Sequence, residues 1–213
     1  MEDKTEKLLR TAFILSLITI FYNLLEGGIS VFFGISDGAL ALFGFGVDSF
    51  VEVVSGLGIT HMILRMRNSQ VKERDYFERF ALKITGASFY ILTAGLIIGS
   101  VLNIIQNIKP DTTIPGFIVS IISIISMYIL MKYKLKVGTT LKSDAIIADA
   151  NCTRTCFNLS LILLASSLLY MIIRISYLDV IGSLGIAYFS FKEGKESFEK
   201  ANSENLSCSC EHE

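Results

Sequence analysis

The chain has 213 residues, of which 52% are hydrophobic and 18% are charged, and its formal net charge at pH 7 is −1. The few charges lie in short groups between long apolar stretches, which is typical of a polytopic membrane protein and excludes a soluble fold. Neither the net charge nor the scattered basic residues favour a nucleic acid as a partner.

Six apolar stretches are each close to the roughly 20 residues that a membrane-spanning helix requires. Inside lipid every backbone polar group needs an internal partner, so we expect helices throughout. The sequence therefore predicts an all-α fold, with a six-helix transmembrane domain over residues 1–196, a flexible tail over residues 197–213 and no folded C-terminal domain. The predicted spans are 11–33, 38–64, 80–105, 113–131, 145–173 and 177–191.

The basic residues between these stretches predict the orientation of the chain. Cytoplasmic loops of membrane proteins are enriched in Lys and Arg, so we expect a multi-pass protein of the cell membrane with both termini in the cytoplasm. The residues expected on the cytoplasmic side are Lys4, Lys7, Arg10, Arg65, Arg67, Lys72, Arg74, Arg79, Lys132, Lys134, Lys136 and Lys142, and those expected on the opposite side are Lys109 and Arg174.

Two acidic residues lie in the middle of the second stretch. Asp48 and Glu52 are four residues apart, so a helix places both carboxylates on one face, one turn from each other. Ionised groups are most costly at this depth of a membrane, and two facing carboxylates repel unless protons or a cation lie between them. The pair predicts half of a cation site. The alternative is a buried structural pair that forms hydrogen bonds with neighbouring helices.

The start of the fifth stretch repeats this spacing with thiols, since Cys152 and Cys156 are also four residues apart. If the second and fifth helices pack antiparallel, we expect Asp48 near Cys156 and Glu52 near Cys152. Two carboxylates and two thiolates form a tetrahedral site that suits zinc and softer divalent ions and is poor for magnesium or calcium. The expected ligand is therefore a divalent metal ion, with no organic cofactor. The alternative for the cysteines is ordinary packing.

Three further residues near these positions are second candidates for contact with the ion. Asp149 is a fifth ligand, a proton acceptor at the inner mouth, or an acid favoured by the dipole of the first helical turn. Asp149 and Asn151 are the first alternatives if the cysteines only pack. His61, at the inner end of the second stretch, is either an interfacial side chain or part of an entrance for the ion.

The first stretch and the tail contain the remaining candidates. Glu26 is a candidate partner for Arg154, whose alternative is to extend its charged end to the inner interface. The tail ends in alternating Cys208, Cys210 and His212. These three either chelate a soft ion without any fold and pass it to the inward-facing site, or are incidental to a disordered terminus.

Three segments carry a resemblance to a known family: NLLEGGISVFFGISDGALALFGFGVDSFVEVVSG, SDAIIADANCTRTCFNLS and LDVIGSLGIAYFSFKEGKESF. They resemble the first two, the fifth and the sixth membrane helices of the cation diffusion facilitator superfamily, in particular its short members that have only the six-helix transmembrane domain. The resemblance implies a homodimeric transporter that exports or sequesters a divalent metal, usually zinc, in exchange for protons by alternating access.

The predicted ligands differ from those of the better-known branches of that family, in which the second helix has two aspartates and the fifth has a histidine and an aspartate. Here Asp48, Glu52, Cys152 and Cys156 stand at the same spacing. The change favours thiophilic ions, so cadmium, cuprous copper and ferrous iron are expected alongside zinc. Because the resemblance is to members without a cytoplasmic metal-binding domain, a dimer is expected to form through the membrane helices.

The expected function is export of a divalent metal from the cytoplasm across the lipid bilayer, with protons moving the other way, and not enzymatic catalysis. Acidic side chains brought together cannot all stay ionised, so protons occupy the site until a cation displaces them. Two other classes stay open: a membrane protein that binds or senses metal without transport, and a membrane thiol oxidoreductase that uses Cys152 and Cys156. Against the second, the chain has no Cys-x-x-Cys pair, and thiol exchange does not need the carboxylates.

Overall fold

The computed structural model describes residues 2–67, 74–106, 108–111, 113–141, 144–175 and 177–202. These residues form six helices, one for each predicted stretch, and the all-α fold is confirmed. The helices are α1 (Glu2–Ser36), α2 (Leu40–Arg67), α3 (Arg74–Gln106), α4 (Ile114–Leu141), α5 (Asp144–Ile173) and α6 (Tyr177–Asn202).

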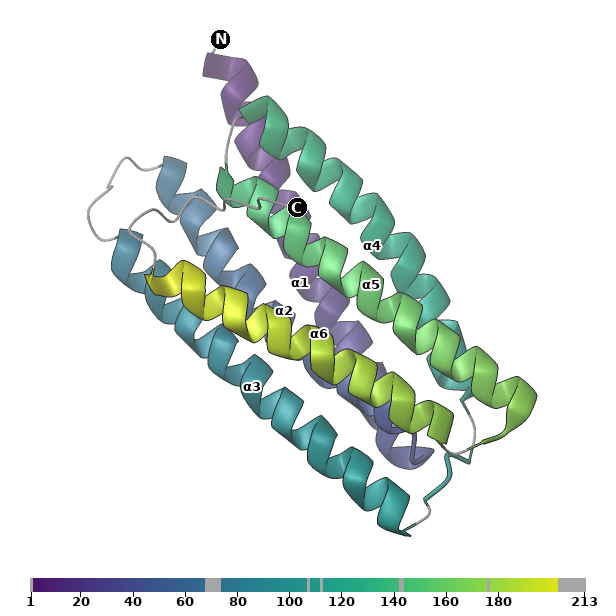
Figure 1. Ribbon diagram of the computed structural model, residues 1–213. Helices are drawn as coiled ribbons and strands as arrows, with labels where there is room; N and C mark the ends of the chain where they lie inside the picture. Colours follow the sequence, from purple (N-terminus) through teal and green to yellow (C-terminus); the bar gives the residue numbers. More distant parts are fainter. Residues whose placement is uncertain are drawn as a thin grey trace.

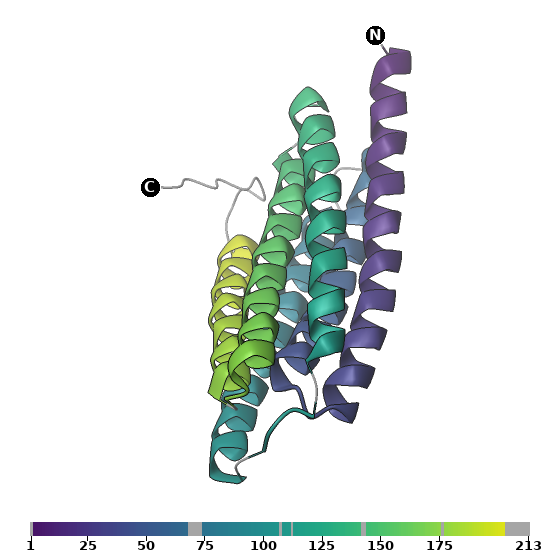
Figure 2. The same ribbon diagram turned by 90° about the vertical axis from the view of Figure 1, so that its right-hand side faces the viewer.

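The bundle consists of three antiparallel helix pairs. α1 packs mainly on α2, α4 on α5, and α3 on α6, which is distant from it in the sequence (Figure 1). Figure 2 shows that the helices run roughly along one common axis. α2 also contacts α3, α5 and α6. It is therefore the central helix, and its two acidic residues lie where several helices meet.

The outside of the bundle is apolar, and its interior carries many small polar side chains. Ile91, Ile105 and Ile172 are 73%, 74% and 71% exposed, respectively. A soluble protein rarely shows a large apolar surface of this kind, so these side chains face lipid. The buried side of α1 is polar at intervals of three or four residues, with Ser16, Thr19, Asn23, Glu26 and Ser30. Membrane helices pack through such small and polar residues, which supports a multi-pass membrane protein.

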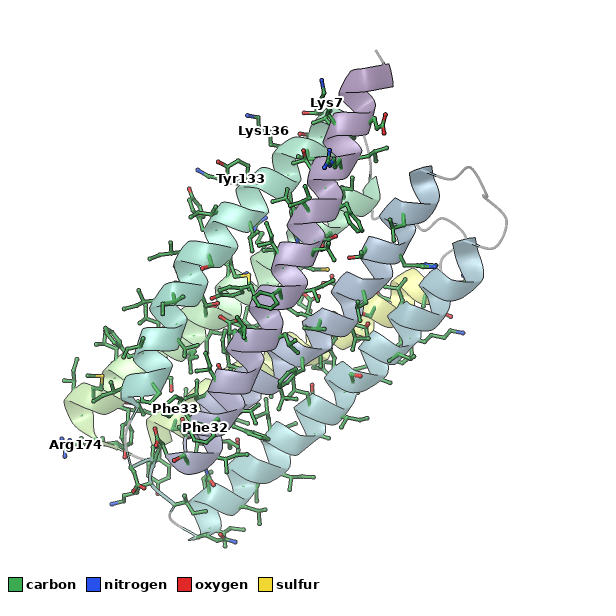
Figure 3. The ribbon with its side chains drawn as sticks, turned by 180° about the vertical axis from the view of Figure 1, so that it is seen from behind. Lys7, Phe32, Phe33, Tyr133, Lys136 and Arg174 are labelled. Atoms are coloured by element: carbon green, nitrogen blue, oxygen red, sulfur yellow. The ribbon has the colours of Figure 1, made fainter. Side chains whose placement is uncertain are left out.

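Five of the described helices contain an apolar segment long enough to cross a membrane. The span predicted at 177–191 is not among them, because its apolar run is short, contains Asp179 and is followed by further charges from Lys192 onwards. α6 nevertheless continues to Asn202, so residues 197–202, predicted to belong to the tail, are helical here. Lys7 and Lys136 lie at one end of the bundle and Arg174 at the other (Figure 3).

A tight turn and a buried carboxylate fix the start of α2. Gly38 has a φ of +66°, a conformation that glycine adopts without strain. Asp179 of α6 accepts hydrogen bonds from the backbone N–H groups of Leu40, at 2.8 Å, and Ala41, at 3.2 Å. A carboxylate at a helix N-terminus satisfies unpaired N–H groups and interacts favourably with the helix dipole. These contacts tie α6 to α2 and set the position of α2 along the bundle.

α1 and α2 approach closely through glycines. A Cβ atom on Gly46 would lie 2.7 Å from the backbone nitrogen of Val31, and one on Gly34 would lie 2.5 Å from that of Phe43. Real Cβ atoms are not found so close to backbone atoms, so any larger residue would push the helices apart. Small residues at membrane helix interfaces permit this backbone contact.

Candidate metal-binding site

The two acidic residues of α2 point into the bundle and are held by different helices. Asp48 is 2% exposed, and its Oδ1 accepts a hydrogen bond from Ser190 Oγ of α6 at 3.4 Å. Glu52 is partly buried, and its Oε2 accepts a hydrogen bond from Asn23 Nδ2 of α1 at 2.9 Å. The neighbouring helices α1 and α6 therefore orient the carboxylates.

α5 brings its thiols to the same region. The Cys156 side chain is buried, and its Sγ donates a hydrogen bond to Oε1 of Glu52. Cys152 lies one turn earlier on α5, and neither cysteine forms a disulfide. The spacing predicts Glu52 opposite Cys152 and Asp48 opposite Cys156. The structure shows a contact between Glu52 and Cys156, because antiparallel packing determines the direction of two helices but not their offset along the axis.

A cavity of about 50 Å³ lies beside these side chains. One water molecule needs only about 10–15 Å³, so the cavity has room for a cation or a few waters. Five helices contribute to its lining, and most of the side chains are polar or acidic. The lining residues are Thr19, Asn23, Asp48, Glu52, Gly56, Leu82, Thr85, Phe89, Asp149, Cys152, Thr153, Thr155, Glu193 and Ser197.

Three of the four predicted ligands line this cavity, and the fourth, Cys156, contacts Glu52 beside it. Glu52 contacts Cys156, while Asp48 and Cys152 are each one turn away on their own helix. Among the residues that the structure describes, no three Cys, His, Asp or Glu side chains come close enough to hold one metal ion. This conformation therefore places the predicted ligands around one space without a closed coordination shell.

Asp149 is held by a buried lysine. Lys134 Nζ lies 2.9 Å from Asp149 Oδ2 and donates a hydrogen bond to Thr153 Oγ1 at 3.0 Å. Lys134 is only 1% exposed, so its charge lies inside the bundle and not on its surface, while its predicted cytoplasmic side stays a prediction. α4 continues past residue 131, where the predicted span ends, and α5 supplies an acid beside the ammonium. Asp149 lines the cavity, and its carboxylate is already paired with the ammonium group of Lys134.

Glu26 has hydroxyl partners in the interior. Its Oε1 accepts a hydrogen bond from the Tyr22 hydroxyl at 2.9 Å, and its Oε2 accepts one from Ser49 Oγ at 3.2 Å. The side chain is 6% exposed. Glu26 therefore takes these two hydroxyls as partners and not Arg154, which is exposed on α5 as its alternative interpretation predicts.

The remaining predicted candidates lie elsewhere. Asn151 is partly buried on α5, and His61 is exposed in the last third of α2. Neither residue belongs to the described lining of the cavity. Cys208, Cys210 and His212 lie outside the residues that the structure describes.

The sequence prediction missed a carboxylate on α6. Glu193 lines the cavity, and its Oε1 accepts a hydrogen bond from Thr155 Oγ1 at 2.8 Å. A signal is present in the sequence, because Glu193 lies three residues after Ser190 and four before Ser197, which places the three on neighbouring positions of one helix face. The charges on either side of Glu193 conceal that signal, since they make the segment look like the solvated end of the chain.

A comparison with protein families gives one match over most of the chain. The family model for the cation efflux transmembrane domain matches residues 16–204. This range contains most of α1 and all of α2 to α6, and so includes the predicted ligands of both α2 and α5. No curated protein matches the chain.

Proposed function

We propose, because this chain belongs to the cation efflux family of metal transporters, that it exports zinc or a softer divalent ion such as cadmium from the cytoplasm. The observation that carries the proposal is the hydrogen bond from the Cys156 thiol to Glu52. It joins a predicted ligand of α2 to a predicted ligand of α5, beside a cavity that Asp48 and Cys152 also line.

The chemistry of this contact suits a metal ion. A proton lies between the sulfur of Cys156 and the carboxylate of Glu52. A cation that replaces this proton turns both side chains into ligands, since thiols bind metal as thiolates. A mixed set of sulfur and oxygen ligands favours zinc and softer ions over magnesium and calcium. Asp48 and Cys152 complete a tetrahedral set if the side chains move towards the same point.

The same replacement supports exchange of metal for protons. Metal binding to a thiol releases its proton, and two facing carboxylates stay together more easily when protonated or bound to a cation. We infer that protons compete with the ion when the site opens to the outside, which helps release it. The proposed cycle is therefore a proton antiport with alternating access.

The proposal includes a homodimer in the bilayer, with both chain termini in the cytoplasm. The position of Lys7 and Lys136 at the same end of the bundle supports the orientation, because positive charge favours the cytoplasmic side (Figure 3). The resemblance of the membrane helices to those of dimeric transporters supports the dimer.

Metal flux into liposomes tests this function. The purified protein is reconstituted around a metal-sensitive dye, and zinc or cadmium is added outside with the lumen more acidic. We expect flux with the wild-type protein, and no flux with Asp48→Asn or Glu52→Gln, which remove charge and nearly preserve shape. Asp111→Asn is the matched control, because Asp111 is exposed in the connection between α3 and α4.

Two results would count against the proposal. Flux that survives both Asp48→Asn and Glu52→Gln would show that the ion takes another route. Zinc binding without flux in the wild-type protein would indicate a membrane metal sensor instead of a transporter.

A further inference from the structure

A further carboxylate, besides those of Asp48, Glu52 and Asp149, faces the cavity from a helix that supplies none of the predicted ligands. Glu193 of α6 lines the cavity together with Asp48 and Glu52 of α2. Thr155 of α5 donates a hydrogen bond to its Oε1 at 2.8 Å. The side chain of Glu193 is therefore fixed beside the α2–α5 contact and does not extend into the solvent.

The position of α6 along the bundle puts Glu193 at the level of Glu52. α2 and α6 run in the same direction, since helices alternate in direction along the chain (Figure 1). Ser190 of α6 contacts Asp48 at 3.4 Å, and Glu193 follows Ser190 by about one turn, as Glu52 follows Asp48. Thr155, which holds Glu193, is the neighbour of Cys156 in the sequence. The contacts at this level thus come from α2, α5 and α6.

Two neutral oxygens at the same cavity are buried without a partner. Within the described residues, Asn23 Oδ1 and Thr85 Oγ1 make no hydrogen bond. Asn23 is 0% exposed and Thr85 is 3% exposed. Both residues line the cavity. A buried acceptor without a donor is costly, and such atoms usually find their partner in an ordered water or an ion. Carbonyl and hydroxyl oxygens beside carboxylates are suited to a cation and its waters.

We propose that Glu193 is a further ligand of the transported ion, so that the site extends from α2 and α5 to α6. The inference rests on the proposed function, because it assigns an additional residue to the same cargo. An additional carboxylate beside the thiols adds a hard oxygen ligand and negative charge, which favours zinc over cadmium relative to a site without it. Thr155 acts as a positioning residue for this carboxylate.

Equilibrium binding of zinc and of cadmium to the purified full-length protein tests the assignment. Glu193→Gln removes the charge and keeps the shape. Replacing a residue that supports a metal ligand typically weakens metal binding ~10–100-fold. We expect the zinc dissociation constant of Glu193→Gln to rise by at least this factor, and its cadmium dissociation constant to rise less. Glu193→Asp keeps a carboxylate and should recover part of the zinc affinity. Thr155→Val, which removes the hydroxyl donor, should weaken zinc binding by a smaller factor.

Glu199→Gln is the matched control on the same helix. The Glu199 side chain is 63% exposed and pairs with Lys195 across the surface at 3.6 Å, so both dissociation constants should stay as in the wild type. Circular dichroism and gel filtration of each variant establish that the fold is retained.

The outcomes separate this inference from the proposed function. Loss of zinc binding in Asp48→Asn together with unchanged binding in Glu193→Gln overturns the role of Glu193 and leaves the α2 site in place. An equal loss for zinc and cadmium in Glu193→Gln also overturns it, because it indicates a structural role. A wild-type protein that binds neither ion overturns both.

Discussion

Replacing Lys134 by Met should destabilise the bundle through the carboxylate that it leaves behind. Lys134 Nζ lies 2.9 Å from Asp149 Oδ2 and 3.0 Å from Thr153 Oγ1, and the side chains of the ion pair are only 2% and 10% exposed. Met has a similar volume without the charge. Removing one partner of a buried pair leaves an uncompensated charge, which costs about 3–5 kcal/mol. We expect a loss of this order in the free energy of unfolding.

Reversible unfolding in mixed detergent micelles, followed by circular dichroism, measures the loss. The double variant Lys134→Met, Asp149→Leu removes both charges and should regain most of the stability, since replacing a whole buried pair is often neutral or stabilising. Lys132→Met is the control, because Lys132 is exposed and its Nζ lies 4.5 Å from the centre of the Tyr128 ring. An exposed contact of this kind is worth about 0.5–1 kcal/mol.

Two results would refute this reasoning about the ion pair. If Lys134→Met costs no more than Lys132→Met, the pair is accessible to water and contributes little. If the double variant is as unstable as Lys134→Met alone, the loss comes from packing and not from the unpaired charge of Asp149.

Three other predictions follow from the site, the topology and the packing. Replacing Cys152 by His and Cys156 by Asp should lower the ratio of cadmium to zinc uptake, because two soft ligands become one borderline and one hard ligand; an unchanged ratio would mean that the cysteines only pack. Reporters fused to either terminus should both be active in the cytoplasm, and an external C-terminus would show that the number of crossings is odd. Gly46→Ala should lower the free energy of unfolding by roughly 1–3 kcal/mol, because the added methyl group forces α1 away from α2. Gly28→Ala is the control and should not lower it, since a Cβ atom there meets nothing within 4 Å; equal stability of the two variants would contradict the close approach.

The sequence predicted the helices and the inward-facing acids because both depend on local properties. The length and hydropathy of each apolar stretch determine whether it can form a membrane helix. The spacing of Asp48 and Glu52 places them on one face, and the structure shows that face inside the bundle. The sequence also shows the charged segment that follows the short apolar run of α6. It does not predict that the helix continues through this segment to Asn202.

The contacts between helices could not be predicted from local properties. The hydrogen bond between Glu52 and Cys156 depends on the axial offset of α2 and α5, which several neighbouring helices set together. One of the contributions is the contact of Asp179 with the start of α2, between residues far apart in the sequence. No spacing rule within a single helix contains this information.

Buried charges near helix ends are difficult to predict for a related reason. Lys134 and Glu193 both lie in charged segments that resemble solvated ends, and hydropathy does not distinguish a buried charge from an exposed one there. Each is buried or partly buried because a side chain on α5 meets it, Asp149 in one case and Thr155 in the other. Only the packed structure identifies these partners.

The proposed transport requires that one ion is held between the carboxylates of α2 and the thiols of α5. X-ray absorption at the zinc edge of the purified, zinc-loaded protein measures the ligands directly. We predict sulfur at about 2.3 Å and oxygen at about 2.0–2.2 Å from the metal. The sulfur shell should disappear when Cys152 and Cys156 are both replaced by Ser. A wild-type spectrum with oxygen and nitrogen ligands alone, or a sulfur shell that survives the double replacement, would contradict the proposed site.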